Sequence, residues 1–325
     1  MKNKKAIAII FLISILSVTI ISLTALFVSA SNTDRYTCLI AGLDYANENT
    51  DVLIVANLDT QDGSVSFIQI PRDTYYDYGG GNNKINGLYA HYKSKGSSDE
   101  DALRLLTKDL EQTFGICIDA SLAIAPDVFR RLVDEIGGVT VSVREDMILE
   151  DEHGIEKLYL RRGENLLMGR DSEIFVRYRK GYAMGDLARV NAQKIFISAL
   201  YKKLTKLSQR KILSLIASIR DDVTLDLKIA VFLKIAIKNQ GRNNDANVKF
   251  VTLPGEALLF HGISYYVLNR DASCEVLSSY LGADCFDDNA KLLIKGAEAF
   301  ENIYYETDFE YIEYSSDTVN DARVR

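Results

Sequence analysis

The sequence predicts a three-layer α/β/α sandwich with a central mixed sheet, preceded by one transmembrane helix. Three observations carry this prediction. Short β-like runs alternate with amphipathic helical segments, 47% of the 325 residues are apolar, and an uncharged apolar run lies near the amino terminus. Alternating strands and helices bury their apolar faces by packing helices against a sheet. The chain after residue 30 is long enough for one sizeable domain or two small ones.

The first 30 residues predict a membrane anchor. Lysines occupy positions 2, 4 and 5, and residues 6–30 carry no charge. About 20 mostly apolar residues cross a bilayer, and lysines before the span favour a cytoplasmic amino terminus. A cleaved signal peptide is the alternative, because Val28-Ser29-Ala30 has the small-residue form of a cleavage site, although the apolar run is long for one. We therefore expect a cytoplasmic segment at residues 1–5, a single-pass anchor in the cell membrane at 6–30, and an extracellular domain over 36–285.

Two β-like runs after the anchor are joined by a segment with an acidic residue at each end. Asp44 follows the first run, residues 39–43, and Asp51 precedes the second, residues 52–55. Magnesium prefers hard oxygen ligands and commonly takes one or two carboxylates, with phosphate oxygens and water completing its coordination. Together with the arginines described below, Asp44 and Asp51 therefore suggest a bridging divalent cation, for which Mg²⁺ is suited. The alternative is that both are ordinary loop residues.

A third β-like run, residues 65–70, ends at Pro71. Proline has no backbone N–H to donate to a sheet, so the strand is expected to stop there. Arg72 follows directly, at the kind of sheet edge where open α/β folds bind ligands. Asp73 adjoins Arg72 and is a candidate to accept a proton from a hydroxyl group that attacks a bound phosphate.

Two amphipathic helices and a strand come next. Residues 98–114 place leucines and a phenylalanine on one stripe and stop at Gly115. Residues 126–136 form the second helix and end at Gly137-Gly138, before a strand at 139–143. The inward residues are Leu103, Leu106, Leu110 and Phe114 in the first helix, and Phe129, Leu132, Val133 and Ile136 in the second.

The segment from 174 to 193 carries several phosphate-type side chains. Alternation over residues 174–179 predicts a strand with Arg177 and Arg179 on one face. Beyond a loop, Asp186 is expected to cap a helix on which Arg189 and Gln193 lie one turn apart. Guanidinium groups stay charged and bind phosphate oxygens in pairs. The segment thus predicts a phosphate or diphosphate site, with a solvated cationic surface as the alternative.

The remaining chain predicts helices near Lys211 and Asp226, a strand at 248–253, and an acidic, tyrosine-rich tail at 286–325 that is partly disordered. The four cysteines permit disulfides in an external setting. Cys38 and Cys117 are expected to be small core residues, and Cys274 and Cys285 are close enough in sequence to pair.

Taken together, these motifs resemble the LytR-CpsA-Psr family of cell-envelope proteins over roughly residues 36–268. The resemblance implies a membrane-anchored transferase that moves a glycopolymer with its phosphate from a polyprenyl (undecaprenyl) diphosphate carrier onto peptidoglycan. The blocks stand in the family's order: Gly42-Leu43-Asp44, Asp51, Ile70-Pro71-Arg72-Asp73-Thr74, Lys84-Ile85-Asn86, Glu135-Ile136-Gly137-Gly138-Val139, and Val176-Arg177-Tyr178-Arg179 with Asp186, Arg189 and Gln193.

The resemblance also implies roles for single residues. Asp44 and Asp51 match the metal-binding acids. The phosphate-contacting set is Arg72, Arg177, Arg179, Arg189 and Gln193, and the catalytic set is Arg72, Asp73 and Arg177. Three departures from the family pattern concern this site: a short link between the two acids, Ala188 in place of a usual glycine, and Ala192 where a further arginine is common.

Two other functions remain open from the sequence. A transcriptional attenuator that binds nucleic acid is disfavoured, because the net charge is −7 and the basic residues are dispersed. A non-catalytic polyprenyl-phosphate-binding module would keep the arginines but lack turnover. Both the transferase and the binding module would have to bind a polyprenyl chain. For both we expect an apolar tunnel between the sheet and its helices, with walls that include Phe129, Leu132, Val133 and Phe196.

Overall fold

A computed structural model describes most of the chain that follows the predicted anchor. The described residues are 35–59, 61, 63–79, 82–143, 145–150, 153, 155–178, 185–219, 222–226, 248–260, 262–281 and 314–315. The predicted anchor, the expected helix beyond Asp226 and nearly all of the predicted tail lie outside them. Within the described ranges, no helix combines the length and apolar character needed to cross a bilayer.

The core of the fold is a seven-stranded mixed sheet with the order β13-β10-β3-β2-β1-β4-β9. β1 pairs in parallel with β4, and β3 with β10, whereas the other neighbours are antiparallel. The carboxyl ends of β1, β3, β4 and β10 therefore meet at one edge, where β2 begins. The strands are β1 Arg35–Leu43, β2 Thr50–Asp59, β3 Val65–Ile70, β4 Ala120–Ile124, β9 Thr224–Asp226, β10 Val248–Thr252 and β13 Tyr314–Ser315. The expected mixed α/β fold around a central mixed sheet is confirmed.

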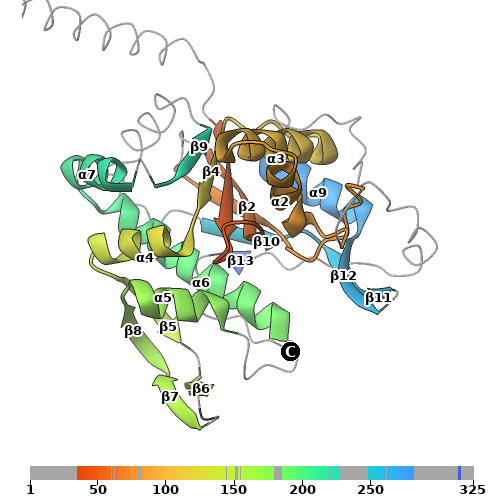
Figure 1. Ribbon diagram of the computed structural model, residues 1–325. Coiled ribbons are helices and arrows are strands. Elements are labelled where there is room, and N and C mark those ends of the chain that lie inside the picture. The colour runs from red at the N-terminus through yellow and green to blue at the C-terminus, as the bar shows by residue number, and fades with distance from the viewer. Residues whose placement is uncertain are drawn as a thin grey trace, which may run out of the picture.

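Helices pack on both faces of this sheet (Figure 1). On one face, α2 (Leu88–Ser94), α3 (Asp99–Phe114) and α9 (Arg270–Leu281) share a buried apolar cluster with the strands. On the other, Ile197 and Tyr201 of α6 (Gly185–Thr205) pack against side chains of β2, β3 and β10. The predicted helix at 98–114 is confirmed. The Ser98 hydroxyl accepts the N–H of Asp101, and Gly115 ends the helix at φ 63°.

A smaller layer of helices and short strands extends away from the sheet (Figure 1). Its cluster joins α4 (Pro126–Glu135), α5 (Gly169–Arg177), α6 and α7 (Gln209–Ile219) to β5 (Val139–Val143), which pairs with β8 (Gly163–Leu167). The four predicted tunnel residues meet in this cluster, with Val133 and Phe196 buried and Phe129 and Leu132 partly buried. Two hairpins complete the chain: β6 (Met147–Glu150) with β7 (Glu156–Leu160), and β11 (Gly255–Phe260) with β12 (Ile263–Leu268).

The predicted strand at 174–179 is wrong, because residues 174–177 form the end of helix α5. Gly169 at the start of α5 packs so closely on α4 that a Cβ there would lie 2.3 Å from the carbonyl oxygen of Arg130. Its N–H also donates to Asp134 Oδ1 at 2.8 Å. Packing against α4 thus overrides the local alternation of Ile174 and Val176, as tertiary contacts commonly override strand propensity.

One smaller expectation, which concerns a cysteine, is also wrong. Cys117 is exposed rather than a core residue. Cys38 is partly buried, and burial raises the pKa of its thiol to about 12, which keeps the thiol protonated at neutral pH. Asp226 ends strand β9, and the residues after it, where the helix near Asp226 is expected to continue, lie outside the described residues. Cys274 lies on α9, while its expected partner Cys285 is outside the described residues.

Candidate functional site

Charged side chains from three segments meet at the edge where β1 and β3 end and β2 begins. Asp44 follows β1, and Arg72 follows β3 after Pro71. Asp51 is the second residue of β2, so it lies in a strand rather than in the expected loop. Arg72 Nη1 donates to Asp51 Oδ1 at 2.6 Å, in a partly buried ion pair.

Arg177 reaches the same carboxylate from α5. Its Nη2 lies 3.6 Å from Asp51 Oδ2, so one oxygen of Asp51 faces each arginine. Arg177 is the last residue of α5, and its Nε lies 3.6 Å from Glu173 Oε1, one turn earlier on the same helix. Asp51 therefore holds two guanidinium groups from distant parts of the chain side by side, an arrangement suited to the oxygens of a phosphate or diphosphate.

The ion pairs extend on both sides of this centre. On one side, Asp73 Oδ2 lies 3.7 Å from Arg72 Nε, and its Oδ1 accepts from Lys84 Nζ at 2.9 Å. On the other, Glu173 lies 3.6 Å from Arg177 Nε and accepts from Arg130 Nη1 at 3.0 Å. The order along the chain of contacts alternates in sign: Lys84, Asp73, Arg72, Asp51, Arg177, Glu173, Arg130. This chain of contacts holds four cations and three anions.

Asp44 shapes the turn between β1 and β2. Its two carboxylate oxygens accept from the N–H of Glu48 at 3.0 Å and from Asn49 Nδ2 at 2.8 Å. Partial burial acts to raise the pKa of Asp44, but hydrogen bonds from Glu48, Asn49 and Ala46 outweigh it and hold the pKa below its usual value. The carboxylate is therefore ionised at neutral pH.

Asp44 and Asp51 fit a magnesium ion only when a substrate supplies further oxygen ligands. Every carboxylate oxygen of Asp44 and Asp51 faces a protein donor, but each keeps a second acceptor lone pair. Within the described ranges, no group of three or more Asp, Glu, His or Cys side chains is arranged to hold a metal. The donor set therefore suits Mg²⁺ bound by one or two carboxylates with diphosphate oxygens and water, and does not form a cage of protein ligands.

Gln193 links the sheet to α6 and α5. It is 4% exposed; its Oε1 accepts from Gln69 Nε2 at 2.8 Å, and its Nε2 donates to the Val176 carbonyl at 3.3 Å. Both polar atoms of the Gln193 amide therefore bind groups within the protein. Gln193 has a structural role in addition to its predicted contact with phosphate. That contact stays a prediction.

A family match covers most of the chain. The sequence model of the LytR_cpsA_psr family matches residues 17–279. The chain belongs to the LytR-CpsA-Psr family. The match confirms the resemblance drawn from the motifs, and it includes every predicted site residue.

Relatives within the LytR-CpsA-Psr family include curated teichoic acid transferases. Polyisoprenyl-teichoic acid–peptidoglycan teichoic acid transferase TagV of Bacillus subtilis (strain 168) is 31% identical over 174 residues, covering 51% of this chain but only 42% of TagV. The transferase TagU of Halalkalibacterium halodurans is 26% identical over 251 residues, covering 75% of this chain and 77% of TagU. The chain thus spans less than half of TagV and about three quarters of TagU in these alignments.

Solved structures of the LytR-CpsA-Psr family share the fold. The crystal structure of B. subtilis TagV has a TM-score of 0.61 and 25% identity, and the match covers 76% of this chain and 97% of that one. A structure of TagT bound to LIIa-WTA has a TM-score of 0.59 and 23% identity, and the match covers 77% of this chain and 91% of TagT.

The structure describes some of the site residues that the resemblance implies, but not all of them. It brings together Asp51, Arg72, Asp73 and Arg177, and it sets Asp44 in the adjacent turn. The helix of Arg189 begins at Gly185, so Asp186 falls within the first turn instead of before it. Arg179 and the side chains of Asp186 and Arg189 lie outside the described residues. The two arginines therefore stay predictions.

Sequence reasoning missed Glu173 and Arg130. Glu173 precedes Arg177 by four residues, the spacing at which oppositely charged side chains meet on a helix. That signal is present in the sequence, but a strand assignment for the segment hides it. The contact of Arg130 with Glu173 joins α4 to α5 and has no counterpart in local sequence spacing.

Proposed function

We propose that this protein is a membrane-anchored transferase that moves a glycopolymer, with its phosphate, from a polyprenyl diphosphate carrier onto peptidoglycan. One observation carries the proposal: Asp51 holds Arg72 and Arg177 together at the edge of the sheet where β1 and β3 end. The names of the relatives TagV and TagU describe transfer of teichoic acid to peptidoglycan, which supports the same reaction class here.

In the proposed reaction, a peptidoglycan sugar hydroxyl attacks the phosphorus that carries the glycan. A new P–O bond forms to that hydroxyl oxygen, and the bond from this phosphorus to the bridging oxygen breaks. Polyprenyl phosphate leaves with the bonding electron pair, and the hydroxyl proton passes to a base, for which Asp73 is a candidate. Catalysis of this kind depends chiefly on positioning and on stabilising spread negative charge. Arg72 and Arg177 would supply that stabilisation.

Magnesium is a further part of the proposal. Asp44 and Asp51 would hold the ion, and the chemistry that it would supply is that of a Lewis acid toward the diphosphate. Independently of the ion, Asp51 aligns the two arginines, and Asp44 orders the adjacent turn.

The lipid part of the carrier requires an apolar site. Each buried CH₂ contributes about 0.8 kcal/mol, so partial burial of a polyprenyl chain would hold the carrier firmly. Phe129, Leu132, Val133 and Phe196 are the proposed contacts, since they gather in the layer between α4 and α6. An anchor at residues 6–30 in the cell membrane would keep this extracellular domain at the surface where the carrier resides.

A non-catalytic polyprenyl-phosphate-binding module is the second candidate. Ala192 is buried against apolar neighbours at the position where an arginine is common in the family, so it adds no cation to the site. Transfer in a purified system distinguishes the two functions, because a binding module retains the carrier without turnover.

The first experiment is mass spectrometry of lipids that co-purify with the detergent-extracted protein. We expect a polyprenyl phosphate or a glycan-linked polyprenyl diphosphate in the wild type and a clear loss of it in Arg72→Ala. Arg104→Ala is the matched control, because Arg104 lies exposed on α3 and pairs with Asp101. Equal lipid retention in wild type and Arg72→Ala would show that the assigned site is wrong.

A further inference from the structure

Arg177 is held on three sides. Asp51 Oδ2 lies 3.6 Å from Nη2, and Glu173 Oε1 lies 3.6 Å from Nε. The ring of Tyr45 covers the guanidinium, with 4.2 Å between Arg177 Cζ and the ring centroid. These contacts engage one edge nitrogen, one amino group and one face of the guanidinium. They fix its plane as well as its position.

Tyr45 reaches Arg177 from a turn that is itself ordered. The side chain is 66% exposed, an unusual setting for a large aromatic ring. Asp44, its neighbour, binds the N–H of Glu48 and the amide of Asn49, and its own N–H donates to the Asn49 carbonyl at 2.9 Å. The turn therefore presents Tyr45 in one place, so stacking on Arg177 costs little further ordering.

Glu173 is the second acidic contact of Arg177. It is 5% exposed, and a carboxylate in such a place is stable only when cations or donors surround it. Arg130 and Arg177 supply the cations. A hydrogen bond to Glu173, together with burial and the charge of that carboxylate, raises the pKa of Tyr45, although Arg177 and Arg130 act in the opposite sense. The Tyr45 ring and the Glu173 carboxylate thus contact the same guanidinium, that of Arg177.

We propose that Tyr45 and Glu173 are positioning residues that clamp the Arg177 guanidinium for the diphosphate. A planar donor binds two phosphate oxygens only in a narrow range of orientations, so a fixed plane favours tight binding. The role of the clamp in binding diphosphate rests on the proposed function. The restraint of the Arg177 guanidinium by Tyr45 and Glu173 does not depend on that function. The test therefore has one readout for each.

The first readout is hydrogen exchange of the Arg177 Nε–H, measured by NMR on ¹⁵N-arginine-labelled full-length protein in detergent. The signal is assigned by its loss in Arg177→Lys. Replacing the carboxylate of Glu173 removes a charge-assisted contact, so we expect exchange to become about tenfold faster in Glu173→Gln, and faster also in Tyr45→Ala. Tyr45→Phe keeps the ring and should stay near wild type. Glu111→Gln on α3 is the matched control, because Glu111 accepts from the Ile118 N–H away from this site.

The second readout is the affinity for geranylgeranyl diphosphate, measured by calorimetry on the same proteins. We expect binding to weaken about tenfold in Glu173→Gln and roughly threefold in Tyr45→Ala. Wild-type exchange and affinity in both variants would overturn the proposal, as would faster exchange with unchanged affinity. If exchange depends on Glu173 and Tyr45 but the wild type binds no diphosphate, the clamp stands and the proposed function fails. Because Tyr45 is exposed, Tyr45→Ala remains informative even if Glu173→Gln does not fold.

Discussion

Asp51 lies between the two arginines of the site, with its Oδ1 2.6 Å from Arg72 Nη1. The other oxygen faces Arg177, which arrives from a helix more than a hundred positions later in the sequence. Two guanidinium groups repel each other, and a shared carboxylate offsets that repulsion. Asp51 therefore has a structural part in the site in addition to its proposed part in binding magnesium.

Replacing either arginine should slow transfer strongly. Because each is proposed to supply a donor to developing negative charge, we expect Arg72→Ala and Arg177→Ala each to reduce turnover by about 10²–10³-fold. The measurement is transfer of a lipid-linked glycan to peptidoglycan by purified protein. Arg104→Ala should match the wild type. Wild-type rates in either site variant would refute the assignment of these arginines.

Removing magnesium should stop the reaction, and Asp51→Asn should weaken the response to the ion. Asparagine keeps the size of Asp51 but loses the charge that pairs with Arg72 and that is proposed to bind Mg²⁺. We expect little transfer in the presence of a chelator, recovery on adding Mg²⁺, and a higher Mg²⁺ requirement in Asp51→Asn. Asp59→Asn, at the far end of β2 in an exposed pair with Arg35, is the control. Full activity in chelator would exclude the metal.

Breaking the amide pair between Gln69 and Gln193 should destabilise the protein. In Gln193→Leu, the buried Nε2 of Gln69 loses its acceptor, at a cost of about 1–3 kcal/mol in the free energy of unfolding. The double variant Gln69→Leu/Gln193→Leu leaves neither group without its partner, so it should recover part of the loss. Urea unfolding of the two single variants and the double variant measures the coupling. Additive losses would contradict the pairing.

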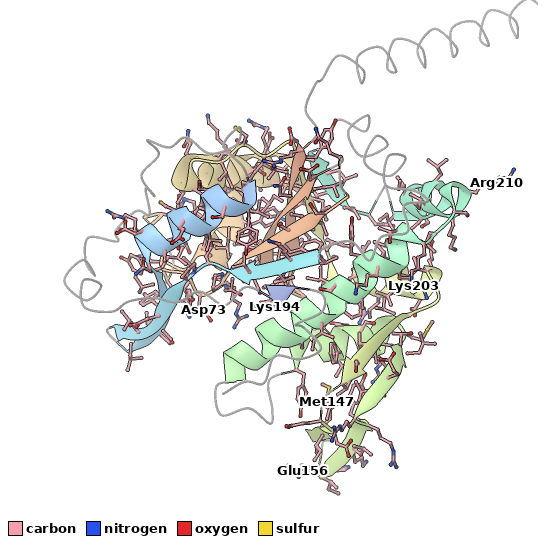
Figure 2. All side chains as sticks on the ribbon, turned by 180° about the vertical axis from the view of Figure 1, so that it is seen from behind. Asp73, Met147, Glu156, Lys194, Lys203 and Arg210 are labelled. Atoms are coloured by element: carbon pink, nitrogen blue, oxygen red, sulfur yellow. The ribbon has the colours of Figure 1, made fainter. Side chains whose placement is uncertain are left out.

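Lys194 should make stability depend on pH. It is 6% exposed and packs between α6 and the sheet, where its Nζ lies 5.7 Å from the ring centroid of Phe250 (Figure 2). Burial lowers its pKa from 10.5 to about 8. Between these values the unfolded chain binds the proton more tightly than the folded one, so the free energy of unfolding should rise with pH across this window. The rise is on the order of 3 kcal/mol.

Lys194→Met tests this expectation. The variant should be more stable than the wild type at pH 7, because it removes the cost of a buried charge, and it should lose the rise between pH 8 and 10.5. Lys202→Met, on the partly exposed side of α6, should keep that rise. Unfolding followed at several pH values provides the measurement. An unchanged pH profile in Lys194→Met would mean that another group is responsible.

Local sequence patterns are sufficient to predict where a strand or helix ends when one or two residues control the backbone there. Pro71 ends β3 and so places Arg72 at the edge of the sheet, and Ser98 and Gly115 bound α3. Each of these features depends on the chemistry of the residue itself, whatever packs around it. The acid and arginine blocks, and the family that they indicate, likewise follow from residue identity and order along the chain.

Tertiary structure alone decided how those residues meet. Segment 174–177 alternates like a strand, but close packing of Gly169 on Arg130 selects a helix, and only then do Glu173 and Arg177 face each other. The expected core position of Cys117 failed because burial depends on what packs above a residue. The sequence by itself determined which charges border the sheet edge. Their pairing through Asp51 was decided by long-range packing, because an ion pair depends on distance in space, which spacing along the chain does not reveal.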